Sequence, residues 1–539
     1  MSHVSDKLRS GQMKSEQIRS PHITNAFWME QAQQWIPKLY EQKVVPEQLI
    51  RSIRDADAFQ GWRIEPLAPA EAMSEQVLRK GDEITLDFGQ HLVGYVTLSL
   101  LNVRSNADAP LRLKLTFGEM PCEVGEDFAT YEGWLSRSWL QDEIVNVDVL
   151  PGTITLNRRY AFRYLKLEIL ETSIRYDLQL KEVFCTTVTS ASMDAITPLP
   201  ASVDEELVQL DQVSIHTLRD CMQTVFEDGP KRDRRLWIGD LRLQALVNYE
   251  TFGCNDLVKR CLYLFAGSRL EGGQVGACLY EKPEPYVDDI YLYDYSLFFI
   301  TTLWDYYEAT KDRDTLEVLW PVAKEQVDIA LKRLDKRGIV QDDETWYCFL
   351  DWHEQLNKQA GAQAVLIYGL KKALCIAREM GLSEQVEQLQ TQIRRAEEAA
   401  LQFLWDEEQG FFMSGEQRQV SWASQVWMIL AEVVDVEVAR ALLQRLKGYY
   451  EAIPMNTPYM MHHYVEALLQ CGQQQEALDQ IRTYWGGMIK DGADTFWELY
   501  NPEDKTYSPY GSNLINSYCH AWSCTPSYFI RRYFAGEEG

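Results

Sequence analysis

The sequence predicts a multidomain protein in which a β-sandwich precedes an all-helical domain. The chain has 539 residues, too many for one ordinary core, and its 46% hydrophobic and 25% charged residues are typical of globular proteins. Between about Trp62 and Val188 apolar residues recur at every second position, which is the period of a strand. After Pro198 and Pro200 the recurrence changes to the helical period of 3.6 residues.

The strand-like region contains several short alternating segments separated by Gly, Asn, Asp and Pro turns, at 83–88, 95–100, 111–117 and 160–169. Such a series predicts a β-sandwich over residues 61–195, after an N-terminal extension over 1–60 that is partly helical. A sandwich in this place either binds carbohydrate or serves packing, and packing is the favoured interpretation.

The helical region spans residues 200–535 and carries amphipathic runs that predict about eleven or twelve helices. They are compatible with an open solenoid or a closed toroid of helix pairs, and the lack of a fixed sequence repeat favours the toroid. In a toroid, loops at one end line a cavity. The runs lie at 203–226, 240–266, 290–310, 314–335, 357–380, 383–405, 420–433, 436–448, 458–471, 473–486 and 514–533.

Composition narrows the class of partner. A formal net charge of -27 disfavours nucleic acid, which is bound through Lys and Arg, so a neutral small molecule or glycan fits better. The polar N-terminus does not resemble a secretory signal, and no apolar run long enough to span a bilayer is apparent. The 11 cysteines show no CxxC or zinc-like spacing, which indicates free thiols in a reducing cytoplasm. We therefore expect no metal and no cofactor.

The segment 227–240 packs four carboxylates and four cations around a tryptophan. Asp228 precedes Gly and Pro and is in part a helix N-cap. Asp233, Trp237 and Asp240 are spaced at i, i+4 and i+7, so they would share one face of any helix formed here. Spacing alone leaves two interpretations open, a site or a solvated surface where the acids pair with the neighbouring arginines, Arg232, Arg234 and Arg235.

A second segment places Glu498 among Phe496, Trp497 and Tyr500. A carboxylate among aromatic rings is desolvated, which raises its pKa and suits it for proton transfer. The alternative is that the rings belong to the core and Glu498 is a buried, hydrogen-bonded carboxylate. His520, which follows in sequence, is by itself better interpreted as a structural histidine.

Two further segments combine acidic and aromatic residues at predicted helix junctions, one around Asp289 and one around Trp352. Each is either a sugar-contact loop or a helix start whose aromatic side chains turn inward. His462 and His463 are interpreted as packing residues. No serine-hydrolase, phosphate-binding, dinucleotide-binding or zinc-protease motif occurs in a credible context.

These segments resemble the α-L-rhamnosidases of glycoside hydrolase family 78, and the likeness covers most of the chain. The Asp-Gly-Pro of 228–230, followed by Asp233 and the pair Gly239-Asp240, is similar to that family's Asp-Cys-Pro opening, general-acid Glu and Gly-Asp pair. The Thr-Phe-Trp-Glu of 495–498 is similar to the Thr-x-Trp-Glu loop that supplies the family's general base. Parts of the sheet region, at 86–90, 94–96 and 158–164, also look like those of the family.

The resemblance implies a β-sandwich followed by an (α/α)6 barrel. It also implies an inverting hydrolase with Asp233 as acid and Glu498 as base, the two carboxyl groups standing roughly 6.5–9.5 Å apart to admit a water. Together with the segments described above, it gives a predicted set of substrate-binding residues: Asp228, Arg232, Trp237, Asp240, Asp289, Trp352, Trp497 and His520.

The chain departs from the family pattern at two positions. Gly229 replaces the Cys of the opening, which is expected to change little. Asp233 replaces the Glu, so its carboxyl reaches one methylene less far toward the glycosidic oxygen. Because a general acid has to stay protonated, the neighbouring arginines are expected to point away from Asp233 or to pair with Glu227 and Asp228.

The sequence thus predicts a glycoside hydrolase that removes terminal α-L-rhamnosyl residues from small oligosaccharides or glycosides in the cytoplasm. One alternative is a hydrolase or lyase for another deoxy or uronic sugar in the same toroid. Another is a non-catalytic glycan-binding relative that lost its acid. No nucleic-acid or membrane partner is expected, and a homodimer is left open.

Overall fold

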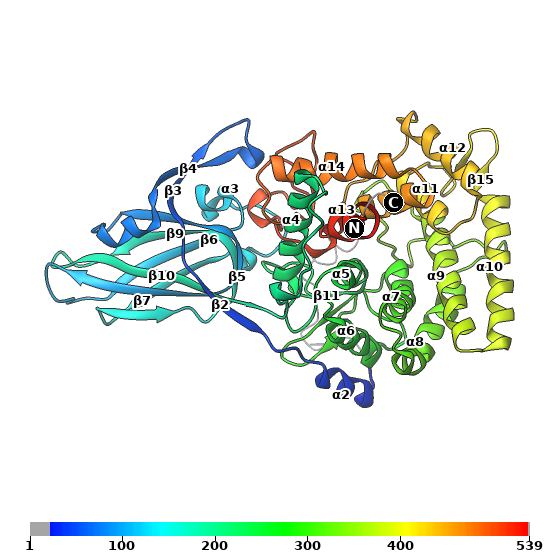
Figure 1. Ribbon diagram of the computed structural model, residues 1–539, viewed down its shortest axis with the longest axis horizontal. Helices are drawn as coiled ribbons and strands as arrows, with labels where there is room; N and C mark the ends of the chain where they lie inside the picture. Colours follow the sequence, from blue (N-terminus) through cyan, green and yellow to red (C-terminus); the bar gives the residue numbers. More distant parts are fainter. Residues whose placement is uncertain (1–21, 537–539) are drawn as a thin grey trace. The chain divides into compact units, whose positions relative to one another are not determined.

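The computed structural model describes residues 22–536, which form two compact units (Figure 1). The sheet unit comprises Pro37–Arg234 and Tyr484–Gly539, and the helical unit comprises Met1–Ile36 and Arg235–Thr483. The N-terminal stretch interpreted above as lacking a signal lies outside the described residues. The division of the chain into domains near residue 60 and near residues 195–200 stays a prediction.

The sheet unit is built on a nine-stranded antiparallel sheet in which β10, β5, β9 and β6 are neighbours (Figure 1). A sheet-rich N-terminal region followed by helices is therefore confirmed. The strands are β2 (Tyr40–Val44), β3 (Gln48–Arg54), β4 (Trp62–Pro69), β5 (Glu83–Val103), β6 (Leu111–Gly118), β7 (Asp142–Val147), β8 (Gly152–Thr155), β9 (Tyr160–Glu171) and β10 (Asp177–Thr189).

Strand β5 is the central strand of this sheet because it pairs with four others. Its first residues pair with β3 and β9, its later residues pair with β8 and β10, and the register shifts between Asp87 and Leu92. Alternate residues of both halves bury their side chains in one hydrophobic core that includes Leu98, Leu115 and Leu180. In the sheet unit the first strand is β2, which begins at Tyr40, earlier than predicted. The sequence did not predict β2 because this strand is polar and mostly exposed and so lacks the alternating pattern.

The helices of the sheet unit are α3 (Pro121–Gly125), α4 (Glu205–Cys221) and α15 (Pro526–Phe529). Asp204 caps α4 by accepting a hydrogen bond from the Leu207 backbone N–H at 3.0 Å. The helix predicted over 514–533 forms only at its end, where α15 continues into a π-helix (Ile530–Phe534), and the preceding stretch contains short 3-10 turns instead. Its backbone is bonded elsewhere: His520 N–H donates to the Phe496 carbonyl and Ala521 N–H to the Asp228 carbonyl.

In the helical unit the alternate helices α5, α7, α9, α11 and α13 pack against one another in that order. Within the described part of this unit the helices are α2 (Ala26–Gln34), α5 (Ile238–Glu250), α6 (Asn255–Gly267), α7 (Tyr293–Thr310), α8 (Arg313–Leu331), α9 (Gln359–Glu379), α10 (Ser383–Phe403), α11 (Trp422–Leu430), α12 (Val436–Lys447), α13 (Pro458–Gln470) and the start of α14 (Gln474–Lys490). Short strands join it: β1 (His22–Thr24), β11 (Leu236–Trp237), β12 (Ser268–Leu270), β13 (Cys278–Tyr280), β14 (Tyr286–Val287), β15 (Trp405–Asp406) and β16 (Phe411–Phe412).

The run predicted as one helix over 240–266 is two helices, α5 and α6. Gly253 adopts a φ of 63°, in the left-handed region that a side chain disfavours, and this turns the chain. Asn248 stabilises the turn because its carbonyl accepts from Gly253 N–H at 2.8 Å and its side chain accepts from Cys254 N–H at 2.9 Å. Periodicity does not detect such a break, since both helices keep the same apolar spacing.

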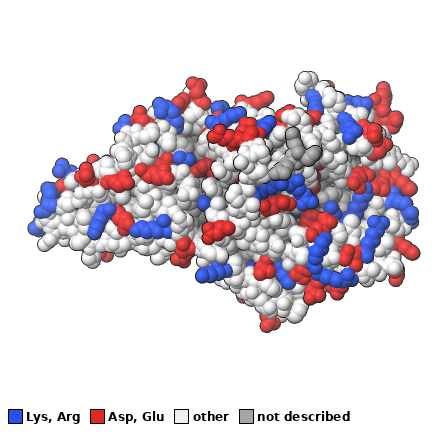
Figure 2. Space-filling model, viewed as in Figure 1, with Lys and Arg blue, Asp and Glu red and all other residues white. Residues whose placement is uncertain are grey.

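Helix α9 is the one described helix long and apolar enough to cross a membrane, by length and composition. Its most apolar window is 83% buried inside the protein, and a core helix passes the same test. On the face shown in Figure 2, acidic and basic side chains are interspersed.

Candidate active site

Glu498 lies on a segment of the sheet unit that is fixed by backbone pairing with residues further along the chain. Its N–H donates to the Ser517 carbonyl at 3.1 Å, and the Phe496 carbonyl accepts from His520 N–H at 2.9 Å. The Trp522 indole N–H donates to the Glu498 carbonyl at 3.0 Å. The backbone on both sides of the carboxylate is therefore held before any side-chain contact is considered.

Both oxygens of the buried Glu498 carboxylate have a donor. Arg232 Nη2 lies 2.5 Å from Oε2, and the Tyr510 hydroxyl donates to Oε1 at 2.5 Å. Burial raises the pKa of Glu498 above its ordinary value, while the Arg232 charge and the Tyr510 hydrogen bond oppose that rise. The site thus holds a desolvated carboxylate whose ionised form is stabilised by two donors.

Arg232 connects the two predicted catalytic residues. Its Nε donates to the Ile515 carbonyl at 2.7 Å, and its guanidinium lies 4.3 Å from the Tyr510 ring centroid. Its Nη1 lies 4.0 Å from Asp233 Oδ1. Since both Nη atoms belong to one planar group, the facing oxygens of Asp233 and Glu498 lie within about 9 Å of each other.

Of the three arginines beside Asp233, Arg232 departs from the predicted arrangement, whereas Arg234 and Arg235 bond to groups other than Asp233. Arg232 faces Glu498 and Asp233 instead of Glu227 and Asp228, because Glu498 is the buried carboxylate within its reach. Arg234 donates to the Arg159 carbonyl at 2.9 Å, and it is Arg159 that pairs with Glu227, at 2.7 Å.

The loop over 228–234 approaches neighbouring backbone closely. A Cβ at Gly229 would stand 2.8 Å from both the Arg232 carbonyl oxygen and Ser517 Oγ, so glycine is required by the local backbone. Asp228 is buried, and its carbonyl accepts from Ala521 N–H at 2.7 Å.

The helix face predicted for Asp233, Trp237 and Asp240 does not form. Helix α5 begins only at Ile238, with Trp237 as its N-cap, so Asp233 lies in a preceding turn. The backbone between them cannot continue the helix toward the N-terminus, because Arg234 has a φ of 59° and Leu236–Trp237 pairs as strand β11 with β13.

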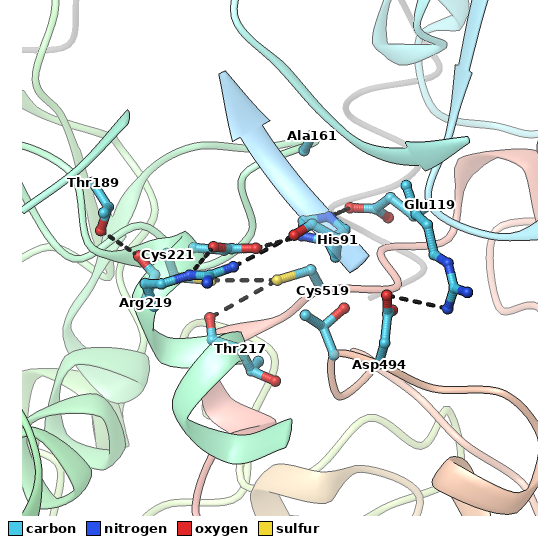
Figure 3. Close-up of polar contacts among 12 residues, drawn as sticks. His91, Glu119, Ala161, Thr189, Thr217, Arg219, Cys221, Asp494 and Cys519 are labelled. Atoms are coloured by element: carbon cyan, nitrogen blue, oxygen red, sulfur yellow. Dashed lines mark hydrogen bonds and ion pairs between the residues drawn. The ribbon is translucent and has the colours of Figure 1, made fainter. Parts of the chain in front are cut away.

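The loop over 228–234 is joined to a buried network of charged side chains through Lys231. Lys231 Nζ contacts Glu123 Oε1 at 2.8 Å and Glu119 Oε2 at 3.3 Å. Glu119 Oε1 in turn faces His91 Nε2 at 3.2 Å, and His91 Nδ1 faces Asp220 Oδ2 at 2.7 Å. Figure 3 shows His91 between Glu119 and side chains of α4. These ion pairs tie the loop that carries Arg232 to the sheet and to α4.

His91 is the centre of this network. Burial alone would lower the pKa of His91, but Cys519 and the hydrogen bonds to Asp220 and Glu119 together raise the pKa well above its ordinary value. The imidazole is therefore a cation between two carboxylates.

The two other predicted contact residues of the sheet unit are both buried. Trp497 is 1% exposed, and its ring stacks on Phe59 with centroids 4.1 Å apart, so in this structure its faces serve packing. His520 Nε2 lies 3.9 Å from Glu498 Oε1. Burial and the Arg232 charge hold the pKa of His520 well below its ordinary value, so a neutral ring faces the carboxylate.

The remaining predicted contact residues belong to the helical unit. Asp240 is buried in the first turn of α5, and Trp237 is half-buried with its ring edge toward Tyr295. Asp289 is exposed. Trp352 is half-buried and lines a cavity of about 250 Å³. Their role in substrate binding stays a prediction.

His462, His463 and Glu466 of α13 offer ligand atoms within 4.8 Å of one another, as a metal site would. The positive charge of Arg242 disfavours a metal cation at this site. Its Nη1 lies 3.4 Å from His463 Nε2, and its Nη2 lies 3.7 Å from Glu466. His463 also packs on Trp427, with ring centroids 4.3 Å apart.

Sequence reasoning missed Tyr510, Glu119, Glu123 and His91. Tyr510 follows the Glu498 segment and is aromatic, which is the one signal that could have found it. The other three lie in the strand region, where no motif surrounds them, and they meet the loop only through the tertiary fold.

We predict that His91→Gln lowers the free energy of unfolding in a pH-dependent way. A group whose folded pKa is raised stabilises the protein below its unfolded pKa of about 6.5, and this contribution disappears as the pH rises through the folded value. The difference between wild type and variant should be about 3 kcal/mol at pH 6 and should shrink above pH ~7, measured by urea unfolding.

His216→Gln is the matched control for this experiment. His216 also lies in α4, and burial together with the charge of Arg219 lowers its pKa to about 4. Its lowered pKa gives the opposite sign: the stability of the wild type relative to the His216 variant should rise by about 0.7 kcal/mol from pH 6 to 7, as the unfolded histidine loses its proton, and stay constant above that. A His91 difference that is constant from about pH 6 to 8 would contradict the charged network.

Comparisons with known proteins agree with the motifs. Residues 46–187 match the glycosyl hydrolase family 78 α-rhamnosidase N-terminal domain, and residues 201–534 match the bacterial α-L-rhamnosidase six-hairpin glycosidase domain. Among curated protein sequences, none matches the chain.

Solved structures give the same family. A rhamnosidase from Klebsiella oxytoca with rhamnose bound is 48% identical, with a TM-score of 0.93 over 95% of this chain and 99% of that one. A family 78 rhamnosidase of Bacillus sp. GL1 is 24% identical, with a TM-score of 0.73 over 87% of this chain and 49% of that one. The second likeness concerns the fold alone. The chain therefore belongs to glycoside hydrolase family 78, the α-rhamnosidase family, and is a glycoside hydrolase.

Proposed function

We propose that the protein hydrolyses terminal α-L-rhamnosides with inversion at the anomeric carbon. The observation that carries this proposal is the buried Glu498 carboxylate, oriented by the Tyr510 hydroxyl and by Arg232, the residue that precedes Asp233 in the chain. The 48% identical rhamnosidase, whose structure holds rhamnose, supports the choice of sugar.

In the proposed mechanism Glu498 is the general base. A water between the carboxylate and the sugar gives its proton to Glu498 while its oxygen bonds to the anomeric carbon. Arg232 and Tyr510 orient the carboxylate, so little rearrangement is needed at the moment of reaction.

Asp233 is the proposed general acid. It gives its proton to the glycosidic oxygen as the bond from that oxygen to the anomeric carbon breaks. Its side chain is 22% exposed, against 8% for Glu498, which suits a group that must reach the leaving group. An inverting pair needs roughly 6.5–9.5 Å between its carboxyl groups for the water, and the two contacts of Arg232 set only an upper bound of about 9 Å on the facing oxygens.

The proposal retains Asp228 and Asp240 as ligands of ring hydroxyls and Trp352 as a sugar contact at its cavity. It assigns Trp497 to packing beneath the site, because its ring stacks on Phe59. It also includes an (α/α)6 barrel, supported by the succession of alternate helices from α5 to α13 that pack against one another.

A small oligosaccharide or glycoside in the cytoplasm is the proposed substrate and setting. The support is that all 11 cysteines, each within the described residues, are free thiols, as a reducing compartment maintains them. The oligomeric state stays a prediction.

We predict that Glu498→Gln and Asp233→Asn each lower kcat on 4-nitrophenyl α-L-rhamnoside by about 10²–10⁴-fold, because each removes a proton-transfer group. Asp494→Asn is the matched control, since Asp494 lies in the same segment but pairs with Arg163 at 3.4 Å. It should retain most of the activity. Near-wild-type rates in both catalytic variants, with wild-type thermal midpoints, would exclude the assignment.

We also predict that Tyr510→Phe moves the acidic limb of the pH profile of kcat/KM to higher pH. The variant loses a donor to the ionised carboxylate, so the pKa of Glu498 rises further and more of the base is protonated at a given pH. Tyr500→Phe, which removes a hydroxyl bonded to Asp491 at 2.9 Å, should leave the limb unchanged. A limb that moves in neither variant would show that this hydrogen bond does not tune the base.

A further inference from the structure

Trp134 is a large aromatic residue that the sheet unit leaves 40% exposed. It lies between the 3-10 helices η3 (Phe128–Thr130) and η4 (Arg137–Trp139), in a region matched by the family's N-terminal domain. This exposure leaves a large part of the apolar area of the indole ring open to solvent.

The orientation of Trp134 is fixed. Its backbone N–H donates to the Tyr510 carbonyl at 3.2 Å, and its indole N–H donates to the Pro509 carbonyl at 3.1 Å. With its only side-chain donor already used, the exposed part of the ring offers a flat apolar face and no hydrogen bond.

The loop around Trp134 is itself ordered by local hydrogen bonds. Asp127 caps η3 by accepting from Ala129 N–H at 2.9 Å, and the Tyr131 hydroxyl donates to the Leu135 carbonyl at 2.9 Å. Ser136 caps η4. The ring is therefore presented by a preformed loop, and little conformational entropy is lost when a ligand packs on it.

The neighbours of Trp134 lead directly to the proposed general base. Its ring lies 5.5 Å from the Tyr510 ring, centroid to centroid, and the Tyr510 hydroxyl donates to Glu498 at 2.5 Å. Glu498 and Tyr510 are both buried, whereas Trp134 is exposed, so this series of contacts ends at the surface. A terminal sugar that reaches the carboxylates lies deeper than Trp134, and the rest of the substrate extends toward solvent.

We propose that Trp134 is a stacking platform for the ring attached to the terminal sugar, which is the leaving-group part of the substrate. Its chemistry selects a flat ring with an apolar face, either the C–H face of a pyranose or an aromatic aglycone. This inference rests on the proposed function. It makes the N-terminal domain a determinant of which glycosides are cleaved.

Three substrates with the same terminal sugar test the proposal: methyl α-L-rhamnoside, 4-nitrophenyl α-L-rhamnoside and a rhamnosyl-glucose disaccharide. Trp134→Ala should lower kcat/KM by about 10-fold on the substrates whose leaving group is a ring, and by less than about twofold on the methyl glycoside. A loss on the disaccharide alone identifies a pyranose as the ligand, and a loss on the aryl glycoside alone identifies an aromatic aglycone.

Further variants separate stacking from packing. Trp134→Phe keeps a ring and should retain most of the selectivity, whereas Trp134→Leu keeps apolar volume against Tyr510 without a flat face and should lose it. Tyr40→Ala removes an aromatic residue of β2 that is 50% exposed and should change none of the three rates.

Two results would overturn the proposal. Equal losses on all three substrates would mean that Trp134 contacts the terminal sugar or only supports Tyr510, and unchanged rates would mean that nothing packs on the ring. If the wild-type protein cleaves none of the three, the proposed function fails, which is a separate outcome.

Discussion

The site depends on the buried ion pair between Arg232 and Glu498. A carboxylate taken out of water is unstable unless other groups replace its hydration, and here a guanidinium and the Tyr510 hydroxyl replace it. Arg232 is in turn held by the Ile515 carbonyl and by the Tyr510 ring. The other end of the same guanidinium lies 4.0 Å from Asp233, so Arg232 contacts both proposed catalytic carboxyl groups.

Arg232 has a fixed position only because its loop is anchored beside it. Lys231, the preceding residue, is buried between Glu119 and Glu123, and the charge network continues through His91 to α4. Removing one partner would leave unpaired charges inside the protein, which is far costlier than losing a surface ion pair. The segment that follows strand β6 thus supplies the carboxylates that hold the loop, Glu119 just after the strand and Glu123 in α3.

The sequence predicted those features whose information is local. The order of strands and helices follows from periodicity, and Glu498 was found because its aromatic neighbours are contiguous with it. The role of Trp497 was not predictable, since its packing partner Phe59 is hundreds of residues away. Periodicity likewise suggested a helix over 514–533, whereas the backbone of that stretch bonds to the Glu498 segment and to the Asp228 loop. Contacts of this kind exist only after the chain has folded.

The central claim is that Asp233 and Glu498 act on opposite sides of the anomeric carbon, with Arg232 between them. The stereochemistry of the first-formed sugar tests this most directly, because only attack by water from the far side inverts the centre. Proton NMR during early turnover of an α-L-rhamnoside should show the β-anomer of rhamnose before mutarotation. Release of the α-anomer would contradict the account, since retention requires a carboxylate to bond to the sugar itself.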